Sequence, residues 1–209
     1  MHSGKVPISV RQGVVLRVAG GRVKRRIIES LGDLLASIVR AQSRLEDCTE
    51  GITVVTINWN TLPFLEVLIR AVQQNAPEGT RLVVVDNAST DGSRSYLRNR
   101  RDIDSVLLPL NIGHGRALDI GVAKARTDTV VLLDVDAFPI SPDWLDRPLA
   151  ALASGMMVSG AHMHRNYIHP CFLVTRRNLV MRARVGFAPV GRVTSAHRFD
   201  LAMDVGEAF

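Results

Sequence analysis

The sequence is poor in cysteine, in lysine and in long apolar runs. Its 209 residues contain 2 cysteines, Cys48 and Cys171, which form neither a disulfide framework nor the spacing of a metal site. No apolar run approaches the roughly 18 to 20 residues that span a bilayer. The N-terminal residues lack the apolar core of a secretory signal. These absences predict a cytoplasmic protein with reduced thiols.

Positive charge is concentrated at the N-terminal end of the chain. The formal net charge is +6, and residues 1–47 carry nine Lys or Arg against four Asp or Glu, so +5 of it lies there. The nearly neutral remainder argues against a nucleic-acid partner across the main domain. A basic N-terminal segment instead fits another protein or an anionic membrane surface, which would place the protein at the inner face of the membrane.

We expect two parts, a basic N-terminal arm with an amphipathic helix (1–49) and an α/β domain (50–209). Residues 1–25 have no sustained period and predict a short hairpin or a loose arm. Residues 27–45 place apolar side chains at helical spacing. The apolar stripe of this helix is expected to pack on the main domain. Peripheral membrane contact and a homodimer contact are the two other interpretations.

Short β-branched runs alternate with helix-length stretches in the next part of the chain. The runs are 52–57, 82–85, 105–108 and 129–133, and the stretches between them are 62–74, 93–100 and 115–125. This alternation predicts βαβ units, and therefore a parallel sheet covered on both faces. Beyond residue 140 we expect a helix at 141–152 capped by Ser141, strands at 156–160 and 168–174, and a helical tail from Phe199.

Polar side chains stand at three predicted strand ends: Asn58, Asp86, and the pair Asp134 and Asp136. Ligands of such sheets bind beyond the carboxyl ends of the strands, so these loops predict one site. While the strand stays extended, Asp134 and Asp136 point the same way. Both are charged at neutral pH and repel each other, and a divalent cation such as Mg²⁺ or Mn²⁺ would remove that conflict. The alternative is a solvated strand end.

Two further segments suggest contacts with a ligand. The carboxylate of Asp86 could accept from a base or ribose, although an Asx-type turn explains such a loop without a ligand. Gly113 and Gly115 precede a helix and would let the backbone approach a ligand, and Arg116 could meet a phosphate there. Their spacing, G-x-G-x5-G, does not match a dinucleotide-binding fingerprint.

Four segments in this order and spacing resemble family 2 glycosyltransferases, which have the GT-A fold, a Rossmann-like, mostly parallel sheet flanked by helices. They are TINWN (56–60), VVVDNASTDGS (83–93), LNIGHGRALDIGVAKA (110–125) and VVLLDVDAFPISPDWL (130–145). The first strand ends in Ile57-Asn58 before Trp59-Asn60, which looks more like the rhamnosyltransferase-type branch. The resemblance implies a nucleotide-diphosphate sugar donor, a saccharide or lipid-linked acceptor, and Mn²⁺ or Mg²⁺ on the diphosphate.

The resemblance also implies roles for individual residues. Nucleotide contact falls on Asn58, Asn60, Asp86, Asn87, Gly113, Gly115, Arg116 and Asp134. Metal contact falls on Asp136 and Asp134, with His169 and His197 as further ligands unless they are simply packed. The family's usual acceptor-side acid is not present in standard form, so we expect the catalytic base to be Asp204, with Asp200 and Glu207 as substitutes.

Three other classes of function compete with this interpretation. A haloacid-dehalogenase-type phosphatase also has a strand ending in D-x-D, but Phe138 stands where it needs Thr or Val and no lysine follows Lys124. A nucleotidyltransferase would have a first loop rich in glycine and lysine, which TINWNTLP is not. A catalytically silent GT-A domain that binds nucleotide-sugars or another protein remains open.

Overall fold

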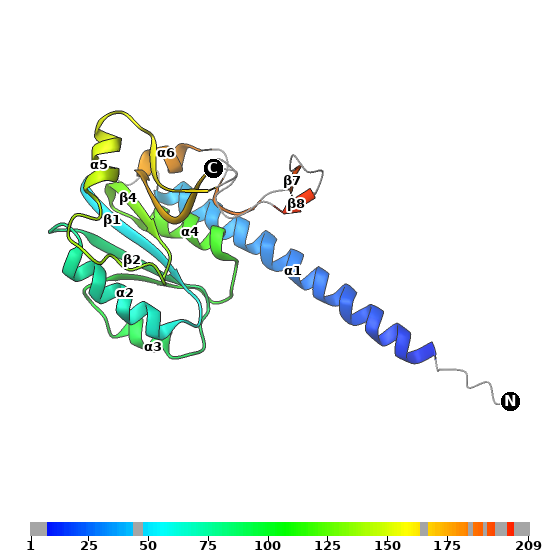
Figure 1. Ribbon diagram of the computed structural model, residues 1–209. Coiled ribbons are helices and arrows are strands. Elements are labelled where there is room, and N and C mark those ends of the chain that lie inside the picture. Colours follow the sequence, from blue (N-terminus) through cyan, green and yellow to red (C-terminus); the bar gives the residue numbers. More distant parts are fainter. Residues whose placement is uncertain are drawn as a thin grey trace.

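A six-stranded sheet in the order β3-β2-β1-β4-β6-β5 forms the centre of the protein (Figure 1). The computed structural model describes residues 8–43, 48–163, 167–183, 186–189, 192–194 and 200–202. The strands of the sheet are β1 (Thr49–Asn58), β2 (Arg81–Asp86), β3 (Asp104–Leu107), β4 (Thr127–Leu133), β5 (Val158–Met163) and β6 (Tyr167–Arg176).

Four neighbouring strands of this sheet are parallel. β1 pairs in parallel with β2 and with β4, and β2 pairs in parallel with β3. β6 runs antiparallel to both β4 and β5. The predicted mostly parallel sheet is therefore confirmed, and the carboxyl ends of β1, β2 and β4 lie at one edge, where the loops with Asn58, Asp86 and Asp134 begin.

Helices cover both faces of the sheet, as the alternating pattern predicts. They are α2 (Leu62–Asn75), α3 (Ser93–Arg98), α4 (His114–Lys124), α5 (Asp146–Ala153) and α6 (Arg177–Arg182). Because successive strand residues point to opposite faces, Val55 packs with α4 in one core cluster and Val54 packs with α2 in the other. Both valines are fully buried, and the near-continuous apolar strands reflect burial on both faces.

The N-terminal segment forms one long helix, α1 (Ile8–Ser43). The expectation of a hairpin or loose arm is therefore wrong for residues 8–25, which contain three glycines but no proline, and glycine lowers helix propensity without removing the backbone donor. Figure 1 shows the N-terminal half of α1 extending away from the sheet, while its C-terminal part lies along α4. The predicted division at residues 49 and 50 stays a prediction.

The two sides of α1 have different environments. Ala36 is buried in the core cluster that contains α4, and Leu35 and Val39 of the predicted apolar stripe pack against that cluster. The expected packing of the whole stripe is wrong, because other large members of it are exposed on the opposite side, namely Ile27, Leu31, Leu34 and Ile38. Among the described helices none is long and apolar enough to cross a membrane.

Two ion pairs join α1 to α4. Arg40 lies 3.2 Å from the carboxylate of Asp119 and also donates to the carbonyl oxygens of Val180 and Ala183 at 2.7 and 3.1 Å. Arg116 pairs with Asp33 at 2.6 Å. The carboxylate of Asp119 is almost inaccessible, and burial raises its pKa to about 6 although Arg40 acts in the opposite direction. The helix is therefore attached through a buried charge as well as apolar contacts.

Two predictions for the later part of the chain are wrong. Ser141 does not cap a helix, because residues 141–145 form turns and α5 begins at Asp146. Trp144 donates to the carbonyl oxygen of Asn75 at 3.1 Å, which attaches these turns to the end of α2. Beyond Phe199, residues Asp200–Ala202 form the strand β8, which pairs with β7 (Arg192–Thr194) instead of continuing as a helix.

We expect Asp119→Asn to remove a pH dependence from the stability of the fold. Because the folded-state pKa of Asp119 is raised, the stability that its protonated form provides is complete below about pH 4 and is lost as the pH rises through about 6. Relative to wild type, Asp119→Asn should therefore gain up to about 3 kcal/mol in free energy of unfolding between pH 4 and pH 7.

Urea unfolding at the two pH values measures this gain. Arg40→Met should steepen the wild-type profile, since it removes the cation that opposes the effect of burial. If the free energies of unfolding of Asp119→Asn and wild type differed by the same amount at both pH values, the raised pKa of Asp119 would be contradicted.

Candidate functional site

A cleft of about 470 Å³ opens at the carboxyl ends of β1, β2 and β4, beside the N-terminus of α4. Four of the predicted site residues line it: Asn87, Gly113, Asp134 and Asp136. The lining also includes Ile57, Trp59, Thr61, Asn111, His114 and Val135. His114 and Asn111 were not predicted as site residues, although both belong to the LNIGHG segment, whose two glycines were predicted to approach a ligand.

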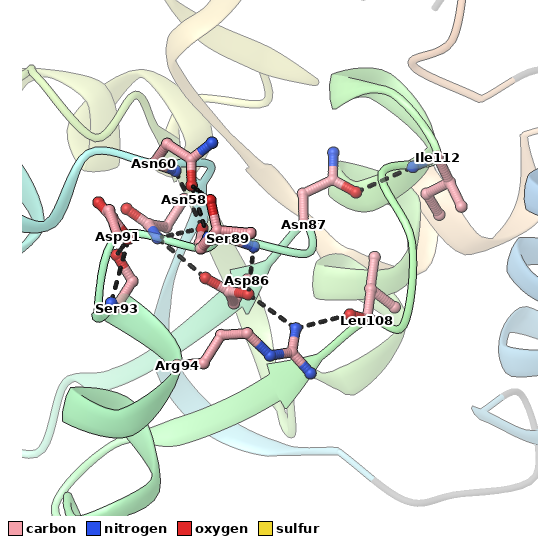
Figure 2. A network of polar contacts seen from close by, with 11 residues as sticks. Asn58, Asn60, Asp86, Asn87, Ser89, Asp91, Ser93, Arg94, Leu108 and Ile112 are labelled. Carbon is pink, nitrogen blue, oxygen red and sulfur yellow. Dashed lines mark hydrogen bonds and ion pairs between the residues drawn. The ribbon is translucent and has the colours of Figure 1, made fainter.

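Asp86 lies behind the cleft with a carboxylate that is 0% exposed. One oxygen accepts the N–H of Ser89 at 3.0 Å and a guanidinium N–H of Arg94 at 2.9 Å, and the other accepts the amide of Asn58 at 3.0 Å. Arg94 also donates to the carbonyl oxygen of Leu108 at 2.6 Å. Figure 2 shows Asp86 between Arg94 on one side and Asn58 with Ser89 on the other. Asp86 therefore holds the loops together.

Asn58 and Asn60 take part in the same network. The buried amide of Asn58 donates to the hydroxyl of Ser89 at 3.0 Å, and its carbonyl oxygen accepts the hydroxyl of Thr61 at 2.7 Å. Asn60 has a φ of 56°, a left-handed conformation that asparagine tolerates better than most residues. Its side-chain oxygen accepts the N–H of Thr90 at 2.7 Å. These bonds join the loop after β1 to the loop after β2, and nucleobase contact through Asn58, Asn60 or Asp86 stays a prediction.

Asn87 connects the second loop to the third and lies at the cleft wall. Its side-chain oxygen accepts the N–H of Ile112 at 3.0 Å, and its amide donates to the side-chain oxygen of Asn111, also at 3.0 Å. The same oxygen of Asn111 accepts the N–H of Gly113 at 2.9 Å. Of the two residues that end VVVDN, Asn87 therefore lines the cleft, whereas Asp86 supports the loops from inside.

The D-x-D pair lies in a turn and not at the end of an extended strand. The N–H of Asp134 continues the sheet by donating to the carbonyl oxygen of Cys171 at 3.0 Å, and the N–H of Ala137 then donates to the carbonyl oxygen of Asp134 at 2.9 Å. Extended geometry was therefore the wrong reason to expect both carboxylates on one side. Asp134, half-buried, and Asp136, exposed, nevertheless line the same cleft.

One oxygen of the Asp134 carboxylate suits the role of a metal ligand. Oδ1 is buried and accepts no hydrogen bond from the part of the chain that the structure describes, and His114 Nε2 lies 3.4 Å from it. A buried carboxylate oxygen without a donor is unfavourable, and a divalent cation would satisfy it. Together with Asp136 on the same cleft, this oxygen makes the donor set suitable for a metal ion.

The three residues at the start of α4 that were predicted to contact a ligand have different environments. Gly113 has a φ of 90° and lines the cleft, a position where its freedom of conformation is needed. A Cβ on Gly115 would lie 2.5 Å from the backbone of Phe187, so this glycine permits close packing with the 186–189 segment. Arg116 is paired with Asp33 of α1. The contacts of Gly115 and Arg116 are thus with other parts of the chain.

The histidines and acids of the C-terminal third have different positions. His169 on β6 lies near Asp134, and its Nδ1 accepts the N–H of Cys171 at 2.9 Å. Burial raises the pKa of the Cys171 thiol, with the charges of Asp134 and Asp136 adding to the effect. His197, Asp204 and Glu207 lie outside the described residues, and only the backbone of Asp200, at the start of β8, lies within them.

Comparison with known proteins relates the site-bearing part of the chain to one family. The model of "Glycosyl transferase family 2" matches residues 53–173, more than half of the chain. A transferase from Aeromonas hydrophila named undecaprenyl-phosphate 4-deoxy-4-formamido-L-arabinose transferase is 27% identical over 145 residues, which are 67% of this chain and 42% of that protein. An uncharacterized glycosyltransferase from Haemophilus influenzae is 28% identical over 120 residues, 56% of this chain and 46% of that protein. The matches span less than half of these relatives.

Solved structures with the same arrangement are GT-A glycosyltransferases, which confirms the predicted fold. The mannosyltransferase PcManGT from Pyrobaculum calidifontis, in complex with GDP-Man and Mn²⁺, has a TM-score of 0.55 at 20% identity, over 79% of this chain and 58% of that one. TarS from S. aureus, in complex with UDP, has a TM-score of 0.53 at 17% identity, over 67% of this chain and 50% of that one. At these identities the likeness concerns the fold alone.

We expect Arg94→Met to destabilise the protein by about 2–4 kcal/mol, because it leaves the buried carboxylate of Asp86 without its cation. Chemical unfolding measures the loss. Arg98→Met on the same short helix is the matched control, since Arg98 is exposed and its loss should change stability by less than about 0.5 kcal/mol. Equal effects of the two substitutions would show that the Asp86 network does not depend on Arg94.

Proposed function

Because this chain belongs to glycosyl transferase family 2, we propose that it moves a sugar from a nucleotide-diphosphate sugar to an acceptor hydroxyl, with inversion at the transferred carbon. The observation that carries the proposal is the cleft that Asp134 and Asp136 line together with Asn87, Gly113 and His114. It lies beyond the carboxyl ends of parallel strands, the usual ligand position in such sheets. The complexes of PcManGT with GDP-Man and of TarS with UDP support a nucleotide-bearing donor.

The residues of the cleft suit the two ends of such a donor. Asn87 offers both an amide and a carbonyl oxygen to a nucleobase or ribose, if it exchanges its bonds to the 111–113 segment. Gly113 and His114 begin an α-helix of 11 residues, whose free N–H groups and dipole favour a phosphate. Trp59 lines the cleft with a side chain that is 55% exposed and provides an apolar wall.

A negative diphosphate is repelled by two carboxylates, so Asp134 and Asp136 need a cation between them and the donor. We propose that they hold Mn²⁺ or Mg²⁺, which when bound would neutralise charge on the departing nucleotide diphosphate. Oδ1 of Asp134, which is buried and accepts no hydrogen bond from the described residues, supports this assignment. Nε2 of His114 lies 3.4 Å from that oxygen.

The acceptor hydroxyl must lose its proton as it attacks the sugar from the side opposite the nucleotide. We assign this proton transfer to Asp204, with Asp200 and Glu207 as the other candidates. We further propose a hexose donor of the rhamnosyltransferase-type branch and a saccharide or lipid-linked acceptor. The name of the Aeromonas relative supports a lipid-linked acceptor. The exposed apolar stripe of α1 and the net positive charge of residues 1–47 support contact with the inner face of a membrane or with a second copy.

Calorimetry of UDP, GDP and dTDP with and without Mn²⁺ tests donor binding. At least one nucleotide should bind at least about tenfold more tightly with Mn²⁺, and Asp136→Asn should abolish that gain while the fold survives. Asp128→Asn, at the opposite end of β4, is the matched control and should keep it. No metal-enhanced binding of any of the three nucleotides would refute the proposal. Binding without any transfer or hydrolysis of the sugar would favour the silent module.

The assignment of the base predicts a separate kinetic effect. Asp204→Asn should lower kcat by roughly 10²–10⁴-fold and leave the affinity for the donor nucleotide unchanged, because a general base acts only on the acceptor. Turnover of donor is compared with that of Asp200→Asn and Glu207→Gln. If either of these produces the larger loss, that residue replaces Asp204 as the base.

A further inference from the structure

Three metal-ligating side chains meet at one point beside the donor cleft. Asp134, His169 and Cys171 each offer one ligand atom, and these atoms all lie within 4.8 Å of one another. The resemblance implies metal contact for Asp134, Asp136 and His169, but it gives no role to the thiol of Cys171. The cluster therefore requires its own explanation.

The pairing of β4 with β6 creates this arrangement. The two strands are antiparallel, and the N–H of Asp134 donates to the carbonyl oxygen of Cys171 at 3.0 Å, which places the carboxylate next to β6. His169 and Cys171 are two residues apart on β6, at the point where the register of β6 against β5 shifts, and Nδ1 of His169 accepts the N–H of Cys171 at 2.9 Å. All three are partly buried. The irregularity in β6 and the pairing with β4 thus bring the three side chains together.

The donor atoms of the three groups suit a cation. Oδ1 of Asp134 is buried without a hydrogen bond from the described residues. Nδ1 of His169 accepts the N–H of Cys171 at 2.9 Å, so its lone pair already faces Cys171, and the ring proton belongs on Nε2. A cation at this point would take the place of that N–H. One oxygen, one nitrogen and one sulfur would then surround it.

The chemistry of this donor set selects the metal. Mg²⁺ prefers oxygen ligands and octahedral geometry, whereas thiolate and imidazole favour Zn²⁺ and, among spectroscopic probes, Co²⁺. Three protein ligands with one remaining position are the arrangement of catalytic zinc sites, in which water or substrate completes the tetrahedron. Because Asp134 also lines the cleft, the remaining position would be reached from the donor side.

We propose that Asp134, His169 and Cys171 form a three-ligand site for a borderline divalent cation of the Zn²⁺ type, and that Cys171 is a metal ligand. On binding, the thiol of Cys171 transfers its proton to solvent and its sulfur forms the bond to the metal. This inference rests on the proposed function in one respect: Asp134 belongs both to this site and to the donor cleft. As a metal site it stands on its own contacts.

Titration of the metal-free protein with Co²⁺ tests the site directly. A thiolate ligand produces an intense sulfur-to-cobalt charge-transfer absorption in the near ultraviolet, which oxygen ligands do not produce. We expect this absorption to saturate at one equivalent of Co²⁺ and to disappear when Zn²⁺ is added. Cys171→Ser and Cys171→Ala should abolish it and weaken Zn²⁺ binding by roughly tenfold or more, since even an outer partner of a metal site contributes that much.

Substitutions of a cysteine and a histidine outside the cluster serve as matched controls. Cys48→Ser, at the exposed cysteine that precedes β1, and His162→Gln, at an exposed histidine of β5, should keep the absorption. His169→Gln should reduce affinity and alter the visible bands of cobalt. Circular dichroism confirms that each variant is folded.

The outcomes separate this inference from the proposed function. Absence of the charge-transfer absorption in the wild-type protein, or its persistence in folded Cys171→Ser, overturns the site, even if nucleotides bind with Mn²⁺ through Asp136. Presence of the absorption with no nucleotide binding supports the site while the proposed reaction fails. A charge-transfer absorption that shifts when nucleotide is added supports both.

Discussion

The buried carboxylate of Asp86 is the interaction on which the architecture of the cleft depends. A charged group that is fully removed from water must find donors within the protein. Asp86 finds them in Asn58, Ser89 and Arg94, and Arg94 continues to the carbonyl oxygen of Leu108. The loops that follow β1, β2 and β3 are thus connected through one carboxylate, and Asn87, its neighbour, is held at the cleft wall.

A second consequence of the sheet concerns the D-x-D pair. Asp134 and Asp136 follow the same strand, yet Asp134 is half-buried against β6 and Asp136 is exposed. The turn that begins at Asp134 separates their environments while both keep contact with the cleft. One carboxylate can therefore belong to an inner cluster with His169 and Cys171, and the other can face a ligand.

The helix α1 adds a third element. Its inner side is held by Arg40 with Asp119 and by Asp33 with Arg116, so Arg116, whose contact with a phosphate stays a prediction, also positions this helix. Its outer side keeps four large apolar side chains exposed along one line. Helix α4 begins at the cleft and carries Arg116 near its start. The same helix therefore borders the donor site and holds α1.

The sequence by itself determined the alternation of strands and helices between residues 52 and 133, the edge of the sheet where the site lies, and the family. Apolar runs and strand-end polar residues are local patterns, and the carboxyl ends of parallel strands meet wherever such patterns alternate. Only the tertiary structure decided which polar residues face the cleft. Asp86 and Asn87 are adjacent in sequence, but Asp86 is enclosed by Asn58, Ser89 and Arg94, whereas Asn87 lines the cleft. Gly115, Arg116 and Cys171 contact segments that are distant in the sequence. Such contacts between distant segments carry no local signature, because burial and pairing of one residue depend on where another element packs.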